Sequence, residues 1–113
     1  TLEEEVARVV RARVVNPKWI KGVMRHGYKG AFEMAATVDY LFAFAATAQC
    51  VGDHHFDAVF EAYLGDDEVR GFLEDHNPAA LKEMSNRLLE AQARGLWQPR
   101  LNSTHTALAA LVA

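Results

Sequence analysis

The sequence AFEMAATVDYLFAFAATAQ, residues 31–49, decides the fold class. It is almost wholly apolar, and its main polar exceptions are Glu33, Thr37, Asp39 and Thr47. A helix that is apolar around most of its circumference packs in the middle of a bundle. The rival interpretation, a membrane span, is disfavoured because Glu33 and Asp39 interrupt the uncharged length that a span requires. The stretch predicts a central buried helix over about residues 30–50.

Two helices are predicted before this stretch. Apolar residues recur at helical spacing in the first of them, at Leu2, Val6, Val9, Val10 and Val14. The pair Asn16-Pro17 ends that helix near Val15, because a residue before proline avoids the helical conformation. Asn16 is also a good N-cap and Pro17 fits a first helical turn, so a short second helix starts there. Gly27 suits the left-handed position that ends it.

Further helices are predicted after residue 50. Asp53 caps a helix with a clean amphipathic pattern, and Gly65 ends it. A short helix starts at Asp66 or Asp67. A second Asn-Pro pair, at Asn77, starts a longer helix that Gly95 closes, and the last helix covers Thr104 to Val112. The two Asn-Pro starts are not an internal repeat, because different residues follow them.

The overall pattern predicts an all-α protein. No run alternates between apolar and polar residues, and no hairpin signal is present. We therefore expect a compact bundle of six to seven helices in one domain, residues 1–113, around the central apolar helix. The chain begins at Thr1 inside dense charge patterning and without an initiator Met, so we expect a fragment of a longer protein.

Composition narrows the function classes. The net charge is −3 and basic residues do not cluster, which argues against nucleic-acid binding. The one cysteine, Cys50, cannot form an internal disulfide and suits a buried, inert thiol. No signal segment opens the sequence. These features predict a cytoplasmic protein that uses neither nucleic acid nor membrane.

Metal-binding candidates lie in the sequence Asp53-His54-His55-Phe56-Asp57. His54, Asp57 and Glu61 share one face of a predicted helix, and imidazole with carboxylate suits Zn, Fe or Co. His55 is adjacent and points elsewhere, but it remains a candidate on chemical grounds. The alternative is a solvated acidic helix start, which the absence of an HExxH motif favours.

Substrate-binding candidates are His26 and Tyr28. A histidine in a last helical turn interacts with the helix dipole, or it faces a substrate pocket as a proton acceptor. Asp39 lies inside the apolar helix, where a buried carboxylate needs a partner; we expect pairing with an arginine or a tyrosine. No residue is assigned a catalytic role, and no recognised nucleotide-binding motif is present.

Five motifs in order resemble the C-terminal region of the large subunit of aerobic cobaltochelatase (the CobN type), a family that includes the magnesium-chelatase large subunit. The similarity covers about Val10 to Arg100. The motifs are Asn16 to Trp19, His26 to Met34, Val38 to Phe42, Asp53 to Asp57, and Gly95 to Trp97.

The resemblance implies a function. In this family the large subunit binds a tetrapyrrole and the metal, and cobaltochelatase is an ATP-dependent ligase that inserts Co(II) into hydrogenobyrinic acid a,c-diamide during cobalamin biosynthesis. An AAA+ ATPase subunit and its adaptor partner hydrolyse the ATP. This chain would be about the last tenth of that subunit, joined to its remainder and inactive alone.

Three alternatives remain open. The chain is a docking module for the ATPase partner or neighbouring domains, a related magnesium-chelatase domain, or a self-standing metal carrier that uses His54, Asp57 and Glu61.

Overall fold

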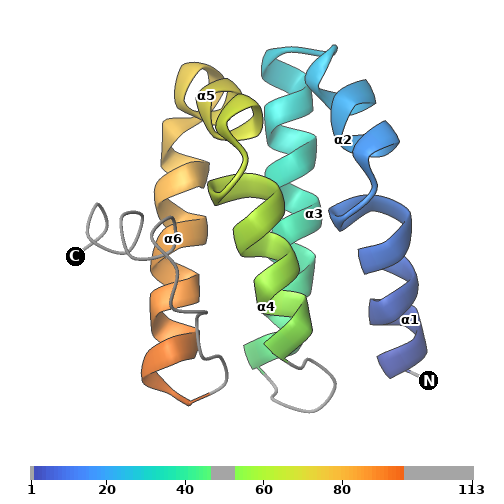
Figure 1. Cartoon of the computed structure of the whole chain (residues 1–113), viewed down its shortest axis with the longest axis vertical. Helices are drawn as coiled ribbons and strands as arrows, with labels where there is room; N and C mark the ends of the chain where they lie inside the picture. The colour runs from blue at the N-terminus through green and yellow to red at the C-terminus, as the bar shows by residue number, and fades with distance from the viewer. Residues whose placement is uncertain (1, 47–52, 96–113) are drawn as a thin grey trace.

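The computed structural model describes residues 2–46 and 53–95, and its helices form two units of three (Figure 1). The first unit contains α1 (Leu2–Val9), a π-helical turn η1 (Val10–Val14), α2 (Pro17–Met24) and α3 (Tyr28–Ala46). The second contains α4 (Asp53–Val59), η2 (Phe60–Leu64), α5 (Asp67–His76) and α6 (Pro78–Ala93). No strand occurs within the described residues, and the all-α prediction is confirmed. The predicted helix over 104–112 and Cys50 lie outside them.

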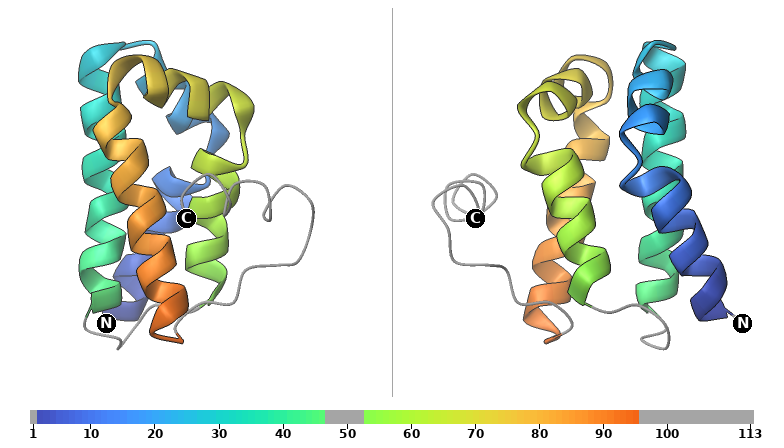
Figure 2. Two further views of the ribbon diagram at one scale, coloured as in Figure 1. Left: turned by 90° about the vertical axis from the view of Figure 1, so that its left-hand side faces the viewer. Right: turned by 45° about the vertical axis from the view of Figure 1, so that its right-hand side comes forward.

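The two units repeat one arrangement. In each, a helix runs to one end of the bundle, a short helix crosses that end, and a long helix returns (Figures 1 and 2). The π turns, short helices and long helices of the two units start 50 residues apart, at Val10 and Phe60, Pro17 and Asp67, and Tyr28 and Pro78. The two Asn-Pro pairs start α2 and α6, which are not equivalent, so those pairs are indeed no repeat.

The helix starts follow the predicted caps. The Asn16 side chain accepts a hydrogen bond from the Lys18 backbone N–H at 3.0 Å. In the second unit Asp66 caps α5 by accepting from the Val69 N–H at 3.0 Å. The turn before α3 uses Gly27 with φ 58°, a conformation that glycine adopts without steric cost. These local signals explain why the predicted helix boundaries are nearly correct.

The core forms between the units from matched positions. Seven pairs of buried apolar residues lie 50 apart among the described residues: Val6 and Phe56, Val10 and Phe60, Val14 and Leu64, Val23 and Leu73, Met34 and Met84, Val38 and Leu88, Leu41 and Ala91. α3 contacts α2, η1, α5 and α6, as expected for a central helix. It starts at Tyr28, slightly before the predicted start, because Gly27 ends the preceding turn.

Gly30 is required by the contact between α2 and α3. It is buried, and a Cβ atom at this position would overlap the backbone carbonyl of Val23. The equivalent residue of the second unit is Ala80, which has a Cβ and is also buried. The two short helices therefore approach their long helices at different distances.

Both π turns end the first helix of their unit. The Val15 N–H donates to the Val10 carbonyl at 3.0 Å, and the Gly65 N–H donates to the Phe60 carbonyl at 2.7 Å, each five residues back. The Tyr63 hydroxyl donates to the Val14 carbonyl at 3.1 Å and joins the two turns. Tyr63 is fully buried, and desolvation raises its pKa. The helical pattern in the sequence did not reveal these wider turns.

Among the described residues, the helices are all too short or too polar to cross a membrane.

Candidate functional site

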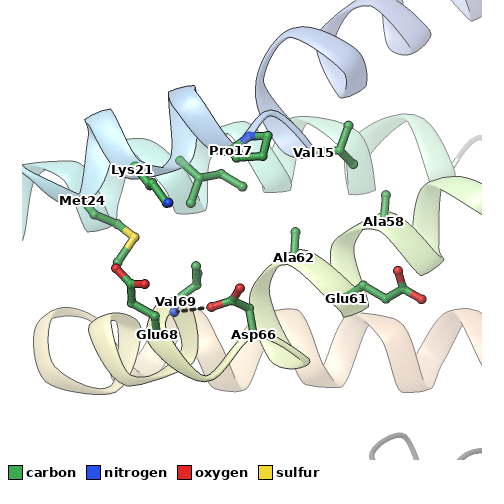
Figure 3. A pocket seen from close by; sticks show the side chains of 11 residues that line it. Val15, Pro17, Lys21, Met24, Ala58, Glu61, Ala62, Asp66, Glu68 and Val69 are labelled. Carbon is green, nitrogen blue, oxygen red and sulfur yellow. Dashed lines mark hydrogen bonds between the residues drawn. The ribbon is translucent and has the colours of Figure 1, made fainter.

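A groove of about 290 Å³ opens where the two units meet (Figure 3). One wall comes from the start and inner face of α2, and the other from α4, η2 and α5. The first wall contains Val15, Pro17, Ile20, Lys21 and Met24. The second contains Ala58, Glu61, Ala62, Asp66, Glu68 and Val69.

The groove is apolar with charged edges. Lys21 belongs to the α2 wall, and Glu61, Asp66 and Glu68 belong to the opposite wall (Figure 3). The Asp66 carboxylate caps α5 by accepting the hydrogen bond from the Val69 N–H. Within the described part of the chain, no group of three His, Cys, Asp or Glu side chains is arranged to hold a metal. The groove was missed at the sequence level because its walls come from segments about 40 to 50 residues apart, and only folding brings them together.

His26 lies in the turn between α2 and α3, and Tyr28 is the first residue of α3, so the two residues lie close together at one end of the bundle. The His26 backbone N–H donates to the Val23 carbonyl at 3.0 Å, and its side chain is exposed. Tyr28 is 63% exposed and packs edge-to-face on Phe32, with ring centroids 4.9 Å apart. Both predicted substrate residues are thus exposed, and the role assigned to them stays a prediction.

The predicted metal residues lie at the start of α4. The side chains of His54 and His55 fall outside the described part of the structure, and Asp57 is half-buried. Glu61 lies in η2, after the helix has changed from α to π, and lines the groove with Ala58 and Ala62 (Figure 3). Metal binding by His54, His55 and Asp57 therefore also stays a prediction.

Asp39 is exposed rather than buried, which corrects the expected environment. Its side chain is 57% exposed because it lies on the face of α3 that points away from the core. The expected arginine partner is confirmed: Arg87 of α6 lies 2.8 Å from the Asp39 carboxylate. Arg87 also pairs with Glu83 at 3.2 Å and lies over the Phe42 ring. Exposed pairs of this kind contribute up to about 1 kcal/mol.

Comparison with known proteins shows which protein family the chain is related to. Residues 1–104 match the family described as CobN/Magnesium Chelatase. The chain belongs to this family. The resemblance seen in the five sequence motifs is confirmed.

The CobN/magnesium chelatase relatives are much longer than this chain. It is 64% identical over 111 residues to an aerobic cobaltochelatase subunit CobN from Sinorhizobium sp, covering 98% of this chain and 9% of that protein. It is 63% identical to the CobN subunit of Pseudomonas aeruginosa, covering 87% and 8%. A magnesium-chelatase subunit from Chlorobaculum parvum is 38% identical over 88 residues, covering 78% and 7%.

A solved structure of the family has the same fold. The catalytic subunit of cobaltochelatase from Mycobacterium tuberculosis superposes with a TM-score of 0.86 at 50% identity. The superposition covers 99% of this chain and 10% of that one. The chain thus spans about a tenth of the length of the relatives it matches.

Proposed function

We propose that this chain is a C-terminal helical domain, residues 1–113, of the large subunit of an ATP-dependent aerobic cobaltochelatase. The whole enzyme would insert Co(II), its substrate metal, into hydrogenobyrinic acid a,c-diamide in the cobalamin pathway. The observation that carries the proposal is the identity of 64% and 63% to two CobN subunits. Identity to the magnesium-chelatase protein of Chlorobaculum parvum is 38%, which favours cobalt over the magnesium alternative.

The chemistry divides the work between this domain and the rest of the enzyme. Insertion requires a base to remove the ring N–H protons and groups that replace the water around the metal. ATP hydrolysis belongs, in this proposal, to an AAA+ ATPase and its adaptor partner. A chain of this size presents too little surface to enclose a macrocycle, so the domain alone would be inactive.

The α2–α3 turn is the part of the domain that we propose contacts the tetrapyrrole. Exposed Arg25 and Lys29 lie next to His26 and to the edge-to-face pair Tyr28–Phe32 in the sequence. Cationic side chains suit the carboxylates of a corrinoid acid, and aromatic edges suit its apolar ring surface. The His26 imidazole adds a ring nitrogen that could serve as the proton acceptor.

The test uses the full-length large subunit with its ATPase partners and follows cobalt insertion by the corrinoid absorbance. His26→Ala should lower kcat/KM by about tenfold or more, the loss expected for a substrate contact or proton acceptor. His76→Ala is the matched control, because His76 is also exposed and lies at the equivalent position of the second unit. Equal activities of the two variants would remove His26 from the site; failure of the unmodified enzyme to insert cobalt would remove the proposed function.

The metal candidates need a separate measurement. If His54, His55 and Asp57 bind Co²⁺, titration of the subunit should show one site that His54→Ala and Asp57→Ala both weaken, because a ligand set loses affinity with each donor removed. Binding that is unchanged in both variants would leave these residues as a solvated helix start.

A further inference from the structure

The outward faces of the two long helices differ at equivalent positions. Four exposed positions at successive turns of α3 carry apolar or aromatic side chains, with exposed Glu33 and Asp39 beside them. We refer to these four residues as the α3 stripe: Phe32, Ala36, Tyr40 and Ala43. Fifty residues later, α6 exposes Lys82, Asn86, Glu90 and Ala93. Phe32 is 49% exposed and Tyr40 is 41% exposed, so large aromatic surface faces outward on α3.

The α3 stripe has the composition of a packed interface. Two aromatic side chains alternate with Ala36 and Ala43, whose small side chains let another helix approach closely. On one border of the stripe, the charge of Asp39 is compensated by Arg87 at 2.8 Å. α6 shows what a solvated face looks like in the same fold. Exposed aromatic side chains grouped on one helix face are typical of a contact site.

We propose that the α3 stripe packs against a helix supplied by the remainder of the large subunit. The inference rests on the proposed function only in that the chain is part of a longer subunit. In the left view of Figure 2, α3 lies at the edge of the bundle, with no other described helix beyond it. The solved cobaltochelatase subunit contains this fold as 10% of its chain, so nine-tenths of that polypeptide lies elsewhere.

The size of the stripe favours a segment of the same polypeptide over a second copy. From Phe32 to Ala43 the stripe is roughly 16 Å long, at about 1.5 Å per helical residue. A stable complex between separate proteins buries about 800 Å² on each partner, more than one short helix face provides. A segment tethered in the same chain needs less surface, because it does not lose translational and rotational freedom on contact.

Cysteine labelling in the full-length subunit tests the proposal. Ala36→Cys and its equivalent Asn86→Cys both lie in the middle of a long helix and both are exposed in the isolated fold. Maleimide modification, read by mass spectrometry of the peptide, should be at least about tenfold slower at position 36 than at position 86, because a packed position reacts only when it opens. Ala43→Cys and Ala93→Cys provide a second pair with the same native residue.

The labelling results distinguish a segment of the same polypeptide from a second copy of the subunit as the partner of the α3 stripe. Protection at positions 36 and 43 that is unchanged between about 0.1 and about 10 µM protein supports a segment of the same polypeptide, because only a second copy follows mass action. Equal labelling within each pair, or protection that is lost on dilution, overturns the proposal. The assay contains no cobalt or corrinoid, so protection in a subunit that cannot insert cobalt would contradict the proposed function and leave this interface intact.

Discussion

The first and second three-helix units have the same inner face and different outer faces. Met34 and Met84 are buried at equivalent positions of α3 and α6, as are Val38 and Leu88. On the outside, Phe32 of α3 corresponds to Lys82 of α6. Burial of apolar surface determines the arrangement of helices, and it acts on the inner positions alone. The outer positions are free to differ, which is where the units acquire separate roles.

The largest expected effect tests whether the inner faces are equivalent. Met34→Ala and Met84→Ala should each lower the free energy of unfolding by about 2–5 kcal/mol, since each removes a buried side chain and leaves a cavity. Urea unfolding of the 113-residue chain measures both. A large loss for one variant and none for the other would show that only one unit carries the core.

The next largest effect compares equivalent positions near the starts of the two long helices, Gly30 in α3 and Ala80 in α6. Gly30→Ala should destabilise the chain by about 1–3 kcal/mol, because the added methyl group overlaps the Val23 carbonyl and α2 must shift. The reverse change in the second unit, Ala80→Gly, should cost about 1 kcal/mol from helix propensity and lost burial. Thermal unfolding of the two variants gives the order, and a Gly30→Ala chain as stable as the native one would contradict the close approach.

The smallest expected effect on the free energy of unfolding comes from the hydrogen bond that joins the two π turns, for which only the second unit supplies a side chain. Tyr63 of the second unit donates to the Val14 carbonyl, whereas the equivalent residue of the first unit, Arg13, is exposed. Tyr63→Phe leaves that carbonyl without its donor and should cost about 1–2 kcal/mol at neutral pH. Urea unfolding at pH 7 measures the loss.

The same residue predicts an alkaline dependence. Burial raises the folded-state pKa of Tyr63 above its unfolded value of about 10. Its contribution to stability is therefore complete below pH about 10 and is lost as the pH rises further, because the unfolded chain then releases a proton that the folded chain retains. In the Tyr63→Phe variant the free energy of unfolding should therefore fall less steeply above pH about 10 than in the native chain, and an equally steep fall would contradict this assignment.

Local sequence signals predicted most of the helix boundaries. Asn16, Asp66 and Asn77 cap helices because short polar side chains satisfy the first backbone N–H groups, whatever the rest of the chain does. The His26 and Tyr28 candidates also lie together, because only Gly27 separates them in the sequence. The groove and the Asp39 environment were not predictable in this way, since each depends on a segment distant in the sequence.

By itself the sequence determined an all-helical chain, its caps and its family, because these depend on the order and spacing of neighbouring residues. Only the tertiary structure decided which face of α3 is covered, that the two π turns meet through Tyr63 and Val14, and that the helices repeat at 50 residues. The physical reason is that packing couples residues that are far apart in the chain. Helical periodicity indicates that one face of a helix is apolar, but it does not indicate which segment packs against that face.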